Sequence, residues 1–99
     1  KIIMKFIQVM EFESSIEEAQ KALEEYIEVA GSKTTARIAT LCIDRDNPKT
    51  IVQIVEFDSY ESATQNNELE ETKEASSEHE ETMGEVGFRN LDVAGVYEL

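Results

Sequence analysis

The chain has 99 residues, enough for one domain with a single hydrophobic core, and no linker divides it. Its 22 acidic and 9 basic side chains give a formal net charge of −13, which argues against binding to nucleic-acid phosphates or to anionic membrane lipids. Cys42 is the single cysteine, so no disulfide can form within the chain, and a reducing cytoplasm is the expected location.

The N-terminal residues 2–10 are predicted to form a strand. Their apolar runs are short and broken by polar residues, unlike those of a signal peptide or a membrane span. A helix should follow, with Ser14 or Ser15 as its N-cap and Gly31 at its end. Its apolar stripe consists of Ile16, Ala19, Leu23, Tyr26, Ile27 and Ala30.

Two further strands are predicted at residues 35–43 and 51–57, joined by a polar turn that contains the only proline of the chain. Like the first strand, they carry apolar residues on both faces. The predicted antiparallel register sets Ile43 opposite Thr50. It also sets Arg37 opposite Glu56, and such a pair of opposite charges supports a register by a few tenths to about 1 kcal/mol.

The third strand should lead into a helix that begins at Asp58. The side chains of Asp58 and Glu61 can each accept a hydrogen bond from the other's free backbone N–H group. The helical region is predicted to reach about residue 81 in two pieces, with a break at Asn66–Asn67.

The last predicted element is a strand over residues 86–99. Gly84 should end the preceding helix, and Gly95 should form a bulge or bend within the strand. The order of elements is then β-α-β-β-α-β. This order predicts an α+β, ferredoxin-like fold, with both helices on one face of a four-stranded antiparallel sheet.

The uncovered face of that sheet should not remain in water, because the strands are apolar on both faces. A second copy of the same sheet is the simplest cover. We therefore expect a homodimer that closes through the sheet face, as a dimeric α/β barrel.

Two stretches carry a resemblance to a known family. QIVEFDSYESA, residues 53–63, leads into an acidic helix, and FRNLDV follows at residues 88–93. Together with the order of elements, they resemble the antibiotic-biosynthesis-monooxygenase-like branch of the dimeric α+β barrels, in particular its uncharacterised bacterial members. That group includes cofactor-independent monooxygenases acting on polycyclic aromatic substrates, haem-degrading enzymes and many small proteins with no assigned activity.

The catalytic pattern of the haem-degrading and several oxidising relatives is not met. Those relatives place an Asn on the first strand, a Trp early in the second helical region and a His further along it. Gln8, Asn66 and Ala75 stand near these places, and the chain has no tryptophan. His79 lies one turn beyond the expected histidine. The resemblance therefore implies the fold and a pocket rather than a complete catalytic site.

The cleft between helices and sheet is where this fold is expected to hold a small molecule. His79, the only histidine, is the candidate acid or base, and Asn66 is a second catalytic candidate that would hold a developing oxyanion. Tyr26, Met83 and Asn90 are the candidate ligand-binding residues. For His79 and Tyr26 a structural role, on a half-exposed helix face and in the core, is favoured over a functional one.

No cofactor and no metal are predicted, because one His and one Cys do not supply three or four converging ligands. The favoured function is binding of a small apolar or aromatic molecule without an intact catalytic motif. One alternative is a cofactor-independent monooxygenase that oxidises an aromatic quinol or anthrone. The other is an interaction module whose acidic helix face binds a basic protein.

Overall fold

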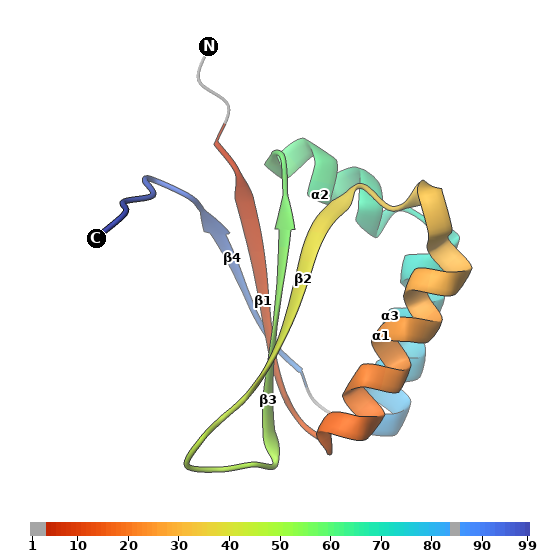
Figure 1. Ribbon diagram of the computed structural model, residues 1–99. Coiled ribbons are helices and arrows are strands. Elements are labelled where there is room, and N and C mark those ends of the chain that lie inside the picture. Colours follow the sequence, from red (N-terminus) through yellow and green to blue (C-terminus); the bar gives the residue numbers. More distant parts are fainter. Residues whose placement is uncertain (1–3, 84–85) are drawn as a thin grey trace.

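The computed structural model describes residues 4–83 and 86–99, with the backbone alone for residues 81–83 (Figure 1). Its elements are β1 (Phe6–Glu13), α1 (Ile16–Ala30), a 3₁₀ turn (Gly31–Lys33), β2 (Ala36–Ile43), β3 (Thr50–Phe57), α2 (Tyr60–Asn67), α3 (Glu70–Met83) and β4 (Gly87–Asp92). The strands form one antiparallel sheet in the order β2-β3-β1-β4.

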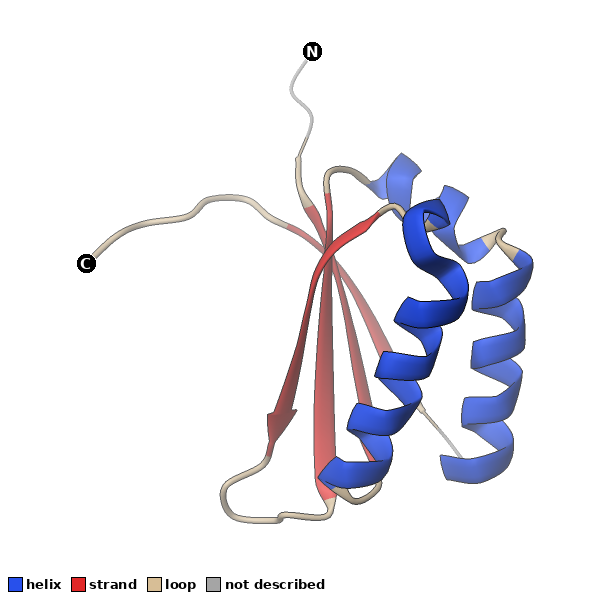
Figure 2. Ribbon diagram, turned by 45° about the vertical axis from the view of Figure 1, so that its right-hand side comes forward, coloured by secondary structure: helices blue, strands red, loops and turns tan. Residues whose placement is uncertain are grey.

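All three helices lie on the same side of this sheet (Figure 2). The predicted α+β, ferredoxin-like fold is therefore confirmed, with the second helical region divided into α2 and α3. None of the helices in the described ranges combines the length and the apolar character needed to cross a membrane.

The core lies between the sheet and the helices and consists of two clusters of buried side chains. One joins Phe6, Val55 and Phe57 to Ala63 of α2, and the other joins Phe12 and Ile51 to Ala19 of α1. Burial of each Phe or Ile contributes about 1.5–3 kcal/mol. The alanines on the helices allow them to approach the large strand residues closely.

Helix α1 begins and ends as its sequence predicts. The Ser15 hydroxyl accepts a hydrogen bond from the Glu18 N–H at 3.2 Å, which satisfies one of the free donors of the first turn. Gly31 follows the helix with a φ of 52°, a backbone conformation that a residue with a Cβ rarely adopts. Ser15, rather than Ser14, is thus the N-cap.

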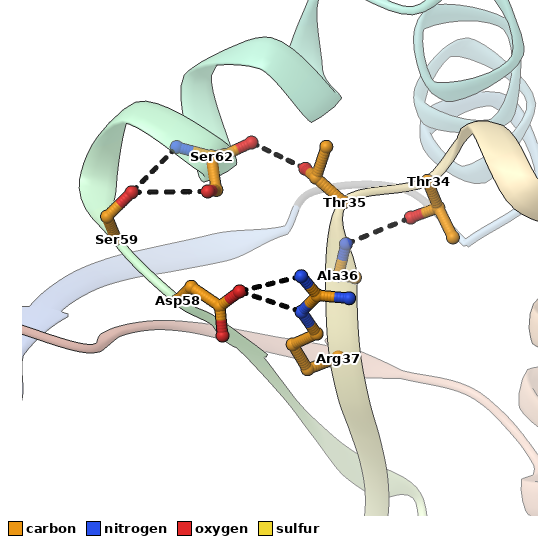
Figure 3. Close-up of polar contacts among 7 residues, drawn as sticks. All are labelled: Thr34, Thr35, Ala36, Arg37, Asp58, Ser59 and Ser62. Atoms are coloured by element: carbon orange, nitrogen blue, oxygen red, sulfur yellow. Dashed lines mark hydrogen bonds and ion pairs between the residues drawn. The ribbon is translucent and has the colours of Figure 1, made fainter.

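The N-cap of α2 is Ser59, so the prediction of Asp58 was wrong by one residue. The Ser59 hydroxyl accepts from the Ser62 N–H at 3.1 Å (Figure 3). Asp58 instead forms an ion pair with Arg37, with one carboxylate oxygen 2.7 Å from Nη2 and 2.8 Å from Nε. The predicted break between the two helical pieces is confirmed, since α2 ends at Asn67 and α3 begins at Glu70.

The predicted register of β2 and β3 was also wrong by one residue, because Ile43 lies opposite Ile51. The cause is the turn, in which the Asp44 carboxylate accepts the N–H groups of Asp46 at 2.8 Å and Asn47 at 3.2 Å. The backbone N–H of Asp44 then donates to the Thr50 carbonyl at 3.0 Å, so Asp44 takes the place opposite Thr50.

A β-bulge near the start of β2 removes Arg37 from the ladder. The pairing passes from Ala36 opposite Phe57 directly to Ile38 opposite Glu56. Arg37 therefore does not pair with Glu56, as the sequence had predicted, and its side chain reaches Asp58 beyond the end of β3.

The two outer strands differ in length from the prediction. β1 continues to Glu13, past the predicted end at residue 10, and the predicted start at residues 2 and 3 lies outside the described residues. β4 ends at Asp92, and the last backbone contact to β1 is the Val93 N–H donating to the Lys5 carbonyl at 2.9 Å. Gly95 therefore lies in no strand, and the bulge predicted there is wrong. Gly84 lies outside the described residues.

The face of the sheet opposite the helices, here called the outer face, carries a group of apolar side chains. Every second residue of each strand points to it, as the register shows. Its apolar members are Ile7, Val9, Ile38, Cys42, Val52, Ile54 and Leu91, of which Ile38 and Leu91 are the most exposed. Charged residues, Glu11, Glu56 and Arg89, stand among them.

Candidate functional site

Tyr26 and Asn66 meet in a polar cluster between α1 and the junction of α2 with α3. Asn66 is buried, with 6% of its surface exposed. Its Oδ1 accepts from the Thr34 hydroxyl at 2.7 Å, the Thr35 N–H at 3.1 Å and the Tyr26 hydroxyl at 3.4 Å. The hydroxyls of Tyr26 and Thr72 also hydrogen-bond at 2.7 Å. The cluster ties three helices to the segment before β2.

The orientation of the Asn66 amide is fixed by this cluster. A backbone N–H can only donate, so the contact from Thr35 identifies the atom facing it as the amide oxygen. The same segment is held a second time, because the Thr35 hydroxyl donates to the Ser62 carbonyl at 2.6 Å (Figure 3). Any contact of Asn66 with an oxyanion would have to come from Nδ2, the only hydrogen-bond donor of this side chain.

His79 lies on α3 against the buried ring of Phe12. The two ring centroids are 4.4 Å apart and the ring planes are nearly perpendicular, at 88°. Burial lowers the pKa of His79 below its ordinary value of 6.5, and the charge of neighbouring Glu80 offsets part of that effect. Burial thus favours the neutral imidazole, the form that can accept a proton.

His79 does not converge with the Tyr26–Asn66 cluster. It follows Thr72 by seven residues on α3, which separates the two positions by about 10 Å along the helix axis. The cluster at Asn66 and the imidazole of His79 are therefore separate features at different heights of the helical layer.

Asn90 lies on β4, opposite Gln8 of β1, and both side chains are on the helix-facing side of the sheet. The Gln8 Nε2 donates to the Asn90 Oδ1 at 3.4 Å. Phe88 lies opposite Met10 on the same side and is 54% exposed. We call the surface formed by Gln8, Met10, Phe88 and Asn90 the β1–β4 shelf.

His79 stands at one end of this shelf. The His79 ring packs on Phe12. Phe12 follows Met10 by two residues on the same face of β1, which separates the two positions by about 7 Å along the strand. Asn90 was predicted from the sequence as a site residue, whereas Phe88 was not, and Gln8 was a candidate only as the counterpart of a family residue. The alternation of Phe88 and Asn90 along β4 was the available signal. The side chain of Met83, the remaining candidate, lies outside the described part of the structure.

A separate open depression of about 580 Å³ lies where the β1–α1 connection meets the β2–β3 turn. It is lined by Glu13, Ser14, Ser15, Ile16, Glu17, Ile43, Pro48 and Lys49. None of the candidate site residues belongs to this lining. In the described part of the chain, no group of three or more His, Cys, Asp or Glu side chains is arranged to hold a metal ion.

No family model matches the chain, and no curated protein has significant sequence similarity to it. Solved structures with the same fold do exist. A variant of SnoaB, a cofactor-independent oxygenase from Streptomyces nogalater, superposes with a TM-score of 0.78 at 10% identity, over 93% of this chain and 95% of that chain.

Two further structures extend this comparison. A putative antibiotic biosynthesis monooxygenase from Caulobacter crescentus has a TM-score of 0.75 at 12% identity, over 94% of this chain and 92% of its own. A conserved protein from Methanosarcina mazei has a TM-score of 0.72 at 15% identity, over 90% and 92%. The expected resemblance in fold to antibiotic-biosynthesis-monooxygenase-like proteins is confirmed by these structures.

Proposed function

We propose that the protein binds a small aromatic molecule on the β1–β4 shelf, on the helix-facing side of the sheet. The observation that carries this proposal is Phe88, an aromatic ring on the helix-facing side of the sheet that remains 54% exposed. A flat apolar ligand could stack on this ring. The neighbouring amides of Gln8 and Asn90 could hydrogen-bond its hydroxyl or carbonyl oxygens.

A titration with a hydroxynaphthoquinone, followed by its absorbance and by the shift in melting temperature, tests this proposal. Phe88→Ala should weaken binding about 10-fold, the equivalent of about 1.4 kcal/mol, because the stacking surface is lost. Val29→Ala, at an exposed apolar position on α1, is the matched control and should bind as the wild type does. Equal affinities for wild type and Phe88→Ala would rule out the shelf.

A second function, cofactor-independent oxidation of an aromatic quinol or anthrone, is favoured by the half-buried imidazole of His79 at the end of the shelf, whose pKa burial lowers. As a base it would remove a proton from the substrate, whose carbanion would react with O₂. With an anthrone, one O₂ would be consumed and a quinone and one water released. SnoaB, with the same fold, is described as a cofactor-independent oxygenase.

Oxygen consumption in the presence of anthrone tests this second function. His79→Ala should lower the rate by about 100-fold, the lower range for loss of a general base. Ser77→Ala, on an exposed turn of the same helix, should leave it unchanged. If His79→Ala consumed O₂ as fast as the wild type, His79 would not be the base.

We also propose that two copies associate through their outer faces. The support is the group of apolar side chains on that face, which a monomer would leave in water. Sedimentation velocity at micromolar concentration should give a dimer. Ile54→Glu, at the centre of the outer face, should give a monomer, whereas Val29→Glu on α1 should not.

A further inference from the structure

The β1–β4 shelf carries two side-chain amides that hydrogen-bond to each other. Gln8 and Asn90 lie directly opposite on neighbouring strands, both on the helix-facing side of the sheet. The Gln8 Nε2 donates to the Asn90 Oδ1 at 3.4 Å, in an exposed place. Within the described residues this is the only hydrogen bond that either side chain makes. We call these two side chains the amide pair.

The hydrogen bond within the amide pair leaves a defined set of groups for a ligand. Each amide has one carbonyl oxygen and one NH₂ group. The bond uses the Asn90 carbonyl and one N–H of Gln8, so the Gln8 carbonyl and the Asn90 NH₂ group are left over. If both amides were turned over, the two residues would only exchange these roles. In either orientation the pair offers one acceptor and one donor, on residues whose Cβ atoms are about 5 Å apart.

Phe88 sets the distance between the amide pair and a surface for stacking. It precedes Asn90 by two residues on the same face of β4, which separates the two positions by about 7 Å along the strand. Its ring is 54% exposed, and β4 is an edge strand, so a flat molecule can approach both residues from the open edge of the sheet (Figure 1). A single ring stacked on Phe88 falls short of the amide pair, whereas two fused rings reach it.

The charge at the shelf disfavours an anionic ligand. Asp92 follows Asn90 by two residues on the same face of β4, about 7 Å further along the strand. None of the ion pairs among the described residues involves Asp92. The formal net charge of −13 adds to the repulsion of a carboxylate or a phenolate. A cyclic amide avoids this repulsion, because it stays neutral at pH 7 while presenting an N–H donor next to a C=O acceptor.

We propose that the shelf selects a bicyclic aromatic lactam, a flat two-ring molecule in which an N–H group lies next to a C=O group. The lactam N–H donates to the free carbonyl of the amide pair, and the lactam C=O accepts from the free NH₂ group. The second ring stacks on Phe88. This inference rests on the proposed function and adds the chemical class of its ligand.

Calorimetric titration with quinolin-2-one and with its N-methyl derivative tests the lactam. The two molecules share their rings and their C=O group, but N-methylation removes the donor. The wild type should bind quinolin-2-one about 10-fold more tightly, because only this molecule can donate to the free carbonyl of the amide pair. The control for the added methyl group is 4-methylquinolin-2-one, which keeps the N–H group and should bind as quinolin-2-one does.

The variant Gln8→Leu with Asn90→Leu removes the amide pair and keeps Phe88. It should bind quinolin-2-one and the N-methyl derivative alike, so the ratio of the two affinities should fall from about 10 to about 1. The matched control, Gln65→Leu with Asn67→Leu, removes two exposed amides from α2 and should keep the ratio of the wild type. The ratio is the readout because a disturbed fold would weaken both ligands together.

NMR spectroscopy locates the contact independently. The side-chain NH₂ signals of Gln8 and Asn90 should shift when quinolin-2-one is added, and those of Gln65 and Asn67 should not. Unchanged signals of Gln8 and Asn90 at saturation would overturn the proposal.

The outcomes separate the lactam from the shelf itself. If the wild type binds a hydroxynaphthoquinone through Phe88 but does not distinguish quinolin-2-one from its N-methyl derivative, the lactam is overturned and the proposed function stands. A ratio that survives in the variant without the amide pair would also overturn the lactam proposal. If the wild type binds none of these molecules, both proposals are overturned.

Discussion

Asn66 is the residue on which the helical layer depends most directly. Replacement by Ala would leave the partly buried Thr35 N–H without its acceptor and would empty part of the cluster. We expect Asn66→Ala to lower the free energy of unfolding by about 1–3 kcal/mol in urea denaturation. Asn67→Ala, at an exposed position in the same helix, should change it little. If Asn66→Ala left the free energy of unfolding unchanged, the cluster would not be what holds the helices together.

His79 should make stability depend on pH. Burial lowers its pKa in the folded state below the ordinary value of 6.5. Above pH 6.5 both states hold a neutral imidazole, and as the pH falls through the window below 6.5 the unfolded state takes up the proton first. The free energy of unfolding should therefore fall with pH in that window. Denaturant titrations between pH 7.5 and about pH 5 should show this slope for the wild type.

The His79→Gln variant provides the control for that slope, because it keeps a polar side chain of similar size but has no imidazole to titrate. The difference in unfolding free energy between wild type and variant should shrink toward lower pH. A difference that stays constant across the window would mean that the pKa of His79 is the same in both states.

At the scale of elements, the start of α2 has two neighbouring residues that could each serve as its N-cap. Ser59 caps the helix, whereas Asp58 forms an exposed ion pair, and such pairs contribute little. Ser59→Ala should cost about 1 kcal/mol of stability. Asp58→Ala should cost clearly less, as measured in the same denaturant series. The reverse order would mean that the Asp58 cap predicted from the sequence operates in solution.

The elements themselves could be predicted because each depends on local residues. Runs of apolar residues on both faces marked the strands, and Ser15 and Gly31 marked the ends of α1. The errors arose where a side chain had more than one possible partner. Asp44 could shorten the turn and Asp58 could find Arg37, and neither choice is decided by sequence spacing alone. β4 stopped at Asp92 because its pairing with β1 ends there.

The candidate site was harder to predict than the fold, because its residues are brought together by register and packing. The sequence identified Tyr26 and Asn66 as neighbours of a cleft, and they do meet. It could not show that the Asn66 oxygen already accepts hydrogen bonds from the protein. Nor could it show that His79 packs on Phe12, two turns of α3 beyond the Asn66 cluster. Phe88 was missed because its exposure depends on the place of β4 at the edge of the sheet.

At the scale of the whole molecule, two copies of this acidic chain repel each other long before their sheets touch. Each carries a formal charge of −13, and exposed glutamates cover much of α1 and α3. Salt shortens the reach of this repulsion, to about 10 Å at 0.1 M ionic strength. Encounters between copies are therefore rare in dilute buffer and become frequent as salt is added.

Pairing in the proposed dimer should for that reason be faster in salt, the opposite of what oppositely charged partners show. In stopped-flow dilution and mixing experiments, the association rate constant should rise about 10-fold between 0.01 M and 0.3 M NaCl while dissociation changes little. An association rate that falls with salt would point to local attraction between charges at the contact. If the rate rises with salt as expected, the speed at which two newly made copies associate is set by the surrounding ions rather than by the shape of their sheets.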